Sequence, residues 1–236
     1  MIDWHSHILP AMDDGSRSLD ESIQMLDEMV RQGVNTVLAT PHFYANEESV
    51  DDFLRRRKES FDLLSSKAVD HDINIVCGAE VRYYSGISRT EGIDKLVIGE
   101  TNLLLLEMPT EKWTDFMVRE LVELANTSGL KLIIAHIERY IYLQNKESIK
   151  ALDEAGILGQ SNSSFFKRFG SRRKAIKLLK SGFIHFIGSD CHNMTTRPPT
   201  LDAAYRLIER KLGEDFVCLM NEYGHRALEN KSKIIF

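Results

Sequence analysis

The sequence predicts an α/β fold, a distorted TIM-like (β/α)7 barrel in which about seven parallel strands alternate with helices. Short apolar runs alternate with helical stretches along the chain, which is typical of right-handed crossovers in a parallel sheet. The length of 236 residues suits seven such units. The first predicted strand is followed by Ser6-His7-Ile8-Leu9-Pro10, without the glycine-rich turn of many open, doubly wound sheets. An open sheet is therefore the second choice.

Apolar runs predict the strands. The first run is short and begins at Ile2, and the second is closed by Pro41. The fourth run consists of four consecutive leucines, as expected of a strand that is buried on both faces. The predicted strands span residues 2–5, 34–40, 73–77, 103–106, 132–135, 157–160 and 183–187.

Capping residues and apolar side chains at helical spacing predict the helices. Ser18 and Glu21 match a capping box, in which each side chain accepts a backbone N–H of the first turn, and Gly33 ends that helix. Gly129 and Gly182 end two later helices. The further predicted helices span residues 50–69, 117–125, 148–154, 172–179, 201–212 and 215–222.

Composition and charge restrict the class of protein. Thirty Lys and Arg against 35 Asp and Glu give a net charge of −5, which disfavours a nucleic-acid partner. The three cysteines are too few and too widely spaced for a disulfide scaffold and suit a reducing compartment. No apolar run approaches the roughly 18 residues of a membrane span, and no signal peptide begins the chain. We expect one cytoplasmic domain over residues 1–236.

Histidines and carboxylates gather just after the predicted strands. In a parallel barrel these strand ends share one face, so the side chains should converge. Burying so many ionisable groups together without a counter-charge would cost several kcal/mol in the free energy of folding. Bound divalent cations would supply that counter-charge. Imidazole and carboxylate without paired thiolates suits two or three Mn, Fe or Zn ions, with Mn²⁺ expected first. The residues concerned are His5, His7, His42, His136, His192, Asp13, Asp14, Glu80, Glu107 and Asp190. We assign structural roles to the other three histidines: His71 at a helix end, His185 in a strand and His225 near a helix start.

A series of short motifs then resembles a known family. The motifs are Asp3-x-His5-x-His7, Asp13-Asp14-Gly15, Thr40-Pro41-His42, Gly78-Ala79-Glu80, Glu107, Ala135-His136-Ile137-Glu138-Arg139-Tyr140, Asn162-Ser163-Ser164, Ser189-Asp190-x-His192-Asn193 and Arg197-Pro198-Pro199. Their order over residues 1 to about 212 resembles the PHP (polymerase and histidinol phosphatase) superfamily. Within it, the chain looks like the CpsB/CapC-type bacterial protein-tyrosine phosphatases. The resemblance implies a seven-unit PHP-type barrel with a metal cluster at the C-terminal ends of its strands.

The resemblance also implies roles for individual residues. The first metal would be held by His5, His7, Glu80 and Asp190. The second would be held by Glu80, Glu107 and His136, so that Glu80 bridges two ions, and the third by Asp14, His42 and His192. Arg139 and Arg197 would face the phosphate. The implied substrate is phosphotyrosine on a bacterial tyrosine kinase, with a tyrosine-rich tail, that regulates capsule or exopolysaccharide synthesis.

For the reaction itself we expect a metal-activated hydroxide to attack phosphorus. Metal ions lower the pKa of a bound water and polarise phosphoryl oxygens. The planar guanidinium groups of Arg139 and Arg197 can hold phosphoryl oxygens at two points. Either Asp190 or His192 could supply a proton to the leaving group, and the sequence does not choose between them.

Cys191 and Arg197 have the C-x5-R spacing of cysteine-dependent tyrosine phosphatases. Those enzymes cradle phosphate in successive backbone N–H groups, usually helped by glycines. The intervening residues here contain no glycine, and Pro198 and Pro199 remove two N–H donors. We therefore predict that the cysteine is not the nucleophile.

Three other functions remain open at this stage. They are a small-molecule phosphatase of the histidinol-phosphate type, a nuclease of the PHP or TatD type, and an adaptor that binds the kinase without catalysis. Two basic runs, Arg55-Arg56-Arg57-Lys58 and Arg172-Arg173-Lys174, are interpreted as solvated helix faces, with docking to an acidic kinase tail as the alternative.

Overall fold

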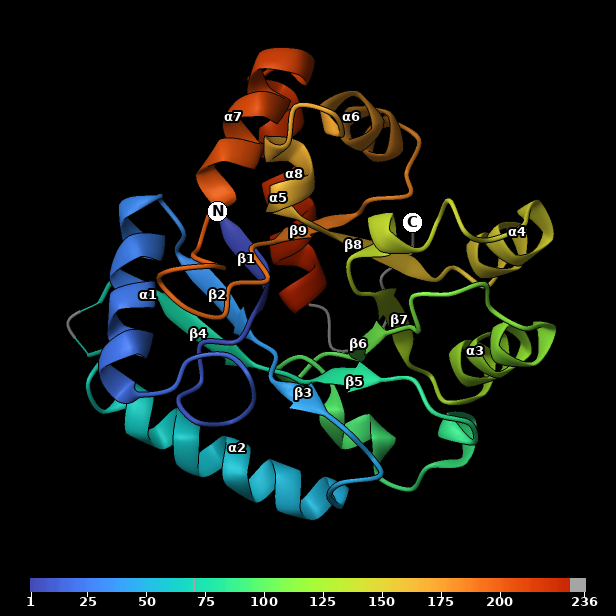
Figure 1. Ribbon diagram of the computed structural model, residues 1–236, viewed down its shortest axis with the longest axis horizontal. Coiled ribbons are helices and arrows are strands. Elements are labelled where there is room, and N and C mark those ends of the chain that lie inside the picture. The colour runs from blue at the N-terminus through green and yellow to red at the C-terminus, as the bar shows by residue number, and fades with distance from the viewer. Residues whose placement is uncertain (70, 230–236) are drawn as a thin grey trace.

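The computed structural model describes residues 1–69 and 71–229, and all strand pairs in this part are parallel. The strands form two sheets (Figure 1). The first has the order β1-β2-β4, with β1 at Ile2–Ser6, β2 at Thr36–Ala39 and β4 at Asn74–Cys77. The second has the order β3-β5-β6-β7-β8-β9, with β3 at His42–Phe43, β5 at Glu80–Arg82, β6 at Leu103–Glu107, β7 at Lys131–Ile134, β8 at Leu158–Asn162 and β9 at Phe186–Gly188.

Two of the predicted strands are each followed by a short strand that the sequence did not predict. β2 ends at Ala39 and the chain re-enters a sheet as β3, because Pro41 between them has no N–H to donate. β4 likewise ends before Gly78 and continues as β5. A side chain at position 78 would come within 3.0 Å of Ile98, so the chain approaches its neighbour closely at this break. The expectation of about seven strands thus becomes nine short ones within the described part of the chain.

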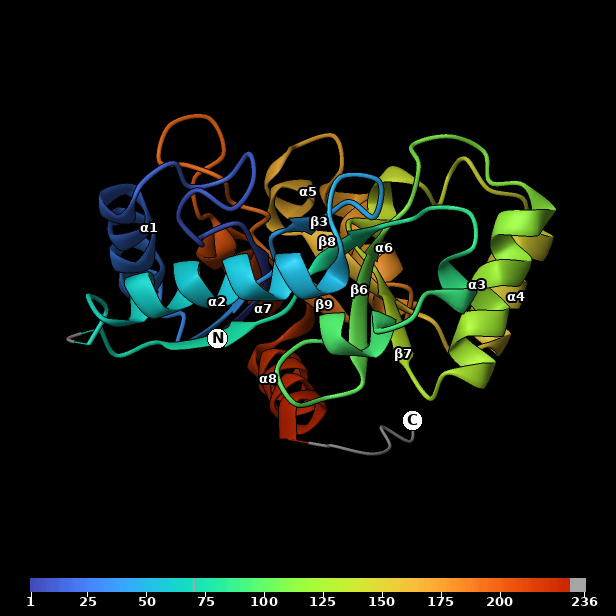
Figure 2. The same ribbon diagram turned by 90° about the horizontal axis from the view of Figure 1, so that it is seen from below.

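The first and last strands lie side by side. Ser6 and Cys191 form an isolated parallel bridge. The Asp190 backbone N–H donates to the carbonyl of His5 at 2.8 Å, and that of His7 donates to the carbonyl of Cys191 at 2.9 Å. The strands therefore curl so that β9 meets β1, and the loops that follow both strands end on the same side of the molecule (upper side in Figure 2).

Helices surround the strands (Figure 1). They are α1 (Leu19–Arg31), α2 (Val50–Ser65), α3 (Asp115–Thr127), α4 (Lys146–Glu154), α5 (Ser163–Lys167), α6 (Arg172–Lys180), α7 (Leu201–Leu212) and α8 (Glu214–Glu229). The chain also forms 3-10 turns at Ile87–Arg89, Ile93–Leu96 and Ile137–Arg139. The sequence did not predict α5, and α8 continues beyond its predicted end at residue 222.

The start of α1 differs from the predicted capping box. The Glu21 backbone N–H donates to the Ser18 hydroxyl at 3.2 Å, as predicted. The Glu21 carboxylate, however, accepts the backbone N–H of Arg17 at 3.0 Å instead of that of Ser18. The serine cap is present, and the reciprocal bond has moved one residue upstream.

Alternate side chains along the strands belong to two different apolar clusters. Leu104, Leu106 and Ile134 face the cluster that the helices cover. The other cluster lies inside the curled strands and consists of Ile2, Trp4, Leu38, Ile98, Leu103, Leu105, Ile133, Ala135, Leu158, Phe186 and Ala227. This alternation follows from the two-residue repeat of a strand.

Helix α8 closes the inner cluster at the end opposite the loops (Figure 2). Its Ala227 is buried in that cluster, and the ring of Tyr223 stacks on Phe186 at 5.4 Å. Gly224 fits because a side chain there would come within 3.0 Å of Ile2. None of the described helices has the length and apolar character needed to cross a membrane.

We predict that Gly188→Ala destabilises the fold. An added methyl group would lie 2.5 Å from Cβ of His5 and 2.9 Å from Nε2 of Gln160, so the backbone must move. Such overpacking costs about 1–3 kcal/mol in the free energy of unfolding, measured by chemical denaturation. Gly170→Ala is the matched control, since nothing lies within 4 Å of its added methyl. Equal stability of the two variants would contradict the prediction.

Candidate metal centre

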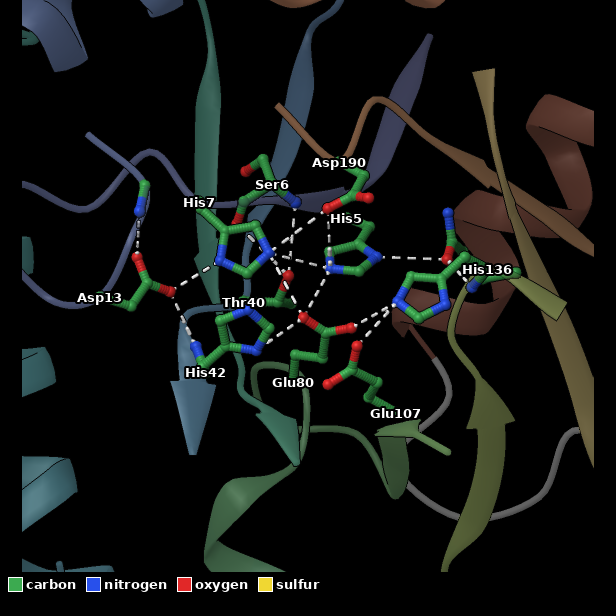
Figure 3. Close-up of polar contacts among 12 residues, drawn as sticks. His5, Ser6, His7, Asp13, Thr40, His42, Glu80, Glu107, His136 and Asp190 are labelled. Atoms are coloured by element: carbon green, nitrogen blue, oxygen red, sulfur yellow. Dashed lines mark hydrogen bonds and ion pairs between the residues drawn. The ribbon is translucent and has the colours of Figure 1, made fainter. Parts of the chain in front are cut away.

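The nine predicted metal ligands converge at the C-terminal ends of the strands. Figure 3 labels seven of them, gathered around Glu80, and Asp14 and His192 lie beside His7 and His42. Oε2 of the buried Glu80 carboxylate lies 3.2 Å from Nε2 of His5, 3.4 Å from Nε2 of His7 and 3.0 Å from Nδ1 of His42. Its other oxygen, Oε1, lies 3.0 Å from Nε2 of His136. Four imidazoles thus face one carboxylate.

The strand ends determine where these side chains lie. His5 and His7 are two residues apart at the end of β1, so they lie on the same face. His42 opens β3 and pairs in register with Glu80, which opens β5. Glu107 is the last residue of β6.

His136 and Asp190 follow β7 and β9 in an unusual backbone conformation. Their φ angles are +35° and +53°, a region that residues other than glycine rarely adopt. Such a backbone costs of order 1–3 kcal/mol and persists only where the surrounding structure holds it. In this conformation the side chain of His136 contacts Glu80, and that of Asp190 faces His5 and His7.

Within the described part of the chain, three sets of donor atoms lie close enough to hold one ion each. They are His7, Asp14, His42 and His192; His5, His7 and Asp190; and His42, Glu80 and Glu107. The sets share His7 and His42, and because an imidazole nitrogen has only one lone pair, each such nitrogen would bind one ion only. His136 is absent from these sets, although its Nε2 lies 3.5 Å from Oε1 of Glu107 as well as beside Glu80.

The donor chemistry of the cluster fits divalent cations. Nε2 of His5 and Nε2 of His7 lie 3.1 Å apart, so without a bound cation one of them must carry the proton that it donates to the other. Nδ1 of His42 faces Glu80 at 3.0 Å and Nε2 of His192 faces Asp14 at 3.3 Å, but neither buried nitrogen has a partner with hydrogen-bond geometry among the described residues. Buried polar atoms normally have partners, and a metal ion would supply one for each nitrogen.

Charge in the cluster is strongly coupled. Burial alone would lower the pKa of His5, but the facing carboxylates of Glu80 and Asp190 raise it. Burial would raise the pKa of Glu80, but the facing imidazoles of His5, His136 and His42 hold it well below its usual value. Protons on histidine balance the carboxylates, and bound cations would displace these protons.

Further residues orient the ligands. Asp13 Oδ2 lies 2.7 Å from Nδ1 of His7 and accepts the backbone N–H of His42 at 2.8 Å. Gln160 Oε1 accepts the backbone N–H of His136 at 2.7 Å and faces Nδ1 of His5 at 3.2 Å. The Asp-Asp-Gly motif signalled Asp13, although not its bond to His7, and no pattern signalled Gln160. Such partners fix the ring orientation of metal ligands.

Arg139 and Arg197 both bind Asp190. Nη2 of Arg139 lies 2.9 Å and Nη2 of Arg197 2.7 Å from Oδ2 of Asp190, which also accepts Nδ2 of Asn162 at 2.6 Å. The other oxygen, Oδ1, faces the imidazoles of His5 and His7 at 3.8 and 3.6 Å. Asp190 therefore connects the histidine cluster to both arginines.

Both arginines line a cavity of about 330 Å³. Their side chains are 38% and 40% exposed, so they can exchange partners with a ligand. Lys167, the last residue of α5, and Arg168 line the same cavity and make it strongly basic. The site thus joins a metal-type cluster to a basic cavity.

Cys191 is unsuited to be a nucleophile. Its side chain is fully buried, and burial together with the nearby carboxylate of Asp3 raises the pKa of the thiol. The side-chain oxygen of Asn193 accepts the backbone N–H groups of Thr195, Thr196 and Arg197 at 3.0, 2.7 and 3.1 Å. These N–H groups therefore do not form a phosphate cradle, which agrees with the prediction.

The remaining histidines lie outside the cluster. Nε2 of His71 contacts Asp27 at 2.9 Å, and Nδ1 of His185 accepts the backbone N–H of Gly159 at 3.1 Å. His185 precedes β9, and burial lowers its pKa to about 4. His225 was expected near a helix start but lies, exposed, well inside α8, because that helix begins at Glu214.

A parallel α/β fold with a histidine–carboxylate cluster at its strand ends, beside two arginines, defines a class of metal-dependent hydrolases. The model of the CpsB/CapC family of capsular polysaccharide synthesis matches residues 1–228. The chain belongs to the CpsB/CapC family.

Relatives and a solved structure agree with this membership. The chain is 31% identical to the tyrosine-protein phosphatase YwqE of Bacillus subtilis, covering 98% of this chain and 93% of that protein. It is 33% identical to the tyrosine-protein phosphatase CpsB of Streptococcus pneumoniae, covering 90% and 91%. The crystal structures of YwqE and CpsB are described as unique metal-dependent tyrosine phosphatases, and one of these chains matches with a TM-score of 0.83, 27% identity and coverage of 100% and 96%.

We predict that Cys191 in the folded chain resists alkylation by iodoacetamide at pH 8. Its thiol is buried with a raised pKa, so little thiolate forms, whereas Cys218 on α8 is exposed and should react. Mass spectrometry of tryptic peptides measures both rates in one sample. Unfolding in urea should make the two rates equal. Equal rates in the folded protein would show that the Cys191 thiol is accessible.

Proposed function

We propose that the chain is a metal-dependent protein-tyrosine phosphatase. One observation carries the proposal: Asp190 joins the buried histidine cluster through one oxygen and both cavity arginines through the other. An activated water and a bound phosphate would therefore be neighbours. The names of the relatives, tyrosine-protein phosphatases, support the same activity.

The proposal includes a finer description of the fold. We propose that the two sheets form one distorted (β/α)7 barrel of the PHP type, in a single domain over residues 1–236. The contacts between β9 and β1, and the runs from β2 into β3 and from β4 into β5, support this description. Seven strand positions then surround the inner cluster.

We further propose that the cluster holds two or three metal ions, with Mn²⁺ first and Fe or Zn as alternatives. The ligands would be His5, His7, Asp14, His42, Glu80, Glu107, His136, Asp190 and His192. Bound metal ions would supply a Lewis acid and an activated water whose pKa lies near 7. The mixed imidazole and carboxylate donors support this choice of metals.

The chain's own residues would bind the phosphate and support departure of tyrosine. Arg139 and Arg197 would exchange one hydrogen bond to Asp190 for the phosphoryl oxygens, which suit their planar guanidinium groups. Burial would raise the pKa of Asp190, but His5 and His7 lower it, so its carboxylate is ionised at neutral pH. Burial lowers the pKa of His192 to about 4. Neither group then carries a ready proton, and a tyrosine leaving group with a pKa near 10 needs less help than an alkyl alcohol.

We propose as substrate a phosphorylated bacterial tyrosine kinase, cytoplasmic and active in capsule or exopolysaccharide synthesis. The name of the family, capsular polysaccharide synthesis, supports this process. Rates on a phosphotyrosyl peptide, histidinol phosphate and DNA separate the phosphatase from the two other hydrolases considered. A stable complex with the phosphorylated kinase but no turnover would instead support an adaptor.

Removal of metal should abolish activity. We expect chelation to lower hydrolysis of p-nitrophenyl phosphate at least about 100-fold and added Mn²⁺ to restore it, because water activation is lost and regained. Metal content is measured by mass spectrometry alongside activity. Cys191→Ala is the matched control and should follow the same cycle, since its thiol is buried. Full activity after confirmed metal removal would refute the proposed site.

Loss of either cavity arginine should lower turnover without loss of metal. We expect Arg139→Ala and Arg197→Ala each to reduce kcat for a phosphotyrosyl peptide about 100-fold, because each removes a charged donor to the phosphoryl group. Metal content should stay at the wild-type level. Arg31→Ala, on the exposed face of α1, is the control. Loss of the metals in both cavity variants would show that the arginines serve the metal cluster instead of phosphate.

A further inference from the structure

A strongly basic segment lies next to the catalytic cavity. Residues 167–180 contain seven cations and no acidic residue, although the whole chain has a net charge of −5. The segment covers the end of α5, the turn after it and helix α6. Its cations are Lys167, Arg168, Arg172, Arg173, Lys174, Lys177 and Lys180.

In the part of the chain that the structure describes, these cations lack the ion pairs with carboxylates that the other basic run, on α2, makes. On α2, Arg55 pairs with Asp52 and Glu59, and Lys58 pairs with Asp62. Within residues 1–69 and 71–229, no carboxylate lies within ion-pair distance of any cation of the 167–180 segment. Their charge is therefore available to a ligand.

Two neighbouring cavities share this segment. Lys167 and Arg168 line the cavity that also contains Arg139 and Arg197. The next residue, Phe169, lines a second cavity of about 810 Å³. Phe169 is 91% exposed, which is unusual for an aromatic side chain without a partner to cover it.

The second cavity lies between α6 and α7, which are neighbours in Figure 1. Arg172 and Arg173 line it from α6, and Arg210 and Lys211 line it from α7. The side chains of Ile176 and Leu207 form its apolar floor. We call these residues, Lys167 to Arg173 together with Arg210 and Lys211, the basic strip.

We propose that the basic strip binds acidic residues that flank the phosphotyrosine of the protein substrate. This inference rests on the proposed phosphatase function and adds a specificity surface to it. A phosphotyrosine held by Arg139 and Arg197 has its peptide neighbours beside Lys167 and Arg168. Carboxylates further along the peptide then meet Arg172 and Arg173, and an apolar or aromatic side chain covers Phe169.

An acidic peptide fits this surface better than a larger polyanion. The strip begins at the catalytic cavity, so a ligand that occupies it is continuous with the group being hydrolysed. The net charge of −5 repels an extended nucleic acid or an anionic membrane, whereas a short peptide meets only the local positive charge. The exposed phenylalanine adds an apolar contact that peptide side chains can satisfy.

The test compares two phosphotyrosyl peptides that differ only in flanking Glu or Gln residues. For the wild-type chain we expect a several-fold higher kcat/KM on the acidic peptide, with the difference shrinking as salt concentration rises. In Arg172→Gln/Arg173→Gln, the ratio of the two kcat/KM values should fall by about fivefold, the size expected for two exposed charge contacts. Arg55→Gln/Lys58→Gln removes the same charge from α2 and should keep the wild-type ratio.

Three results would overturn the inference. Equal rates of the wild type on both peptides would show that no acidic flank is recognised, while the phosphatase function would still stand. Equal reductions of kcat/KM on both peptides in the α6 variant would show that these arginines support the fold and do not bind the acidic flank. Binding of the wild type, but not the variant, to vesicles of phosphatidylcholine and phosphatidylglycerol, without discrimination between the peptides, would make the strip a membrane contact. No hydrolysis of either peptide by the Mn²⁺-loaded wild type would refute the phosphatase function itself.

Discussion

The structure depends on one buried carboxylate. Glu80 is about 1% exposed and faces the imidazoles of His5, His7, His42 and His136. A carboxylate in such a place is stable only if positive charge surrounds it, whether as protons on histidine or as metal ions. The breaks that separate β2 from β3 and β4 from β5 place His42 and Glu80 side by side at the start of the second sheet. The path of the chain therefore places an imidazole next to the carboxylate that needs positive charge around it.

The sequence predicted the strands and helices well where local signals are strong. The leucine run became β6, and the serine cap of α1 formed as predicted. The prediction failed where local structure depends on distant partners. No local pattern reveals that the close approach of Gly78 to Ile98 ends a strand, or that α5 occupies a single turn after β8. The Glu21 carboxylate accepts the backbone N–H of Arg17 and not that of Ser18, which the spacing of the two capping residues does not reveal.

The sequence predicted which residues bring their donor atoms together in the candidate site. All nine predicted ligands meet because parallel strands present their C-terminal ends on one face. The residues that orient these ligands were harder to find. Asp13 holds His7 and the His42 backbone, and Gln160 holds His136, through contacts that connect separate strands. Sequence spacing describes one strand at a time, so it does not reveal which side chain of a neighbouring strand completes a hydrogen bond.

The meeting of β9 with β1 has a consequence for biosynthesis. His5 is synthesised 184 residues before Ser189, whose hydroxyl donates to the His5 carbonyl. The first and last thirds of the polypeptide each supply residues to the cluster, so all nine proposed ligands are present only once residue 192 has been synthesised. Long-range contacts of this kind form slowly and late in folding. A nascent chain that has not reached residue 190 therefore holds His5 and His7 without the carboxylate of Asp190 that later faces them.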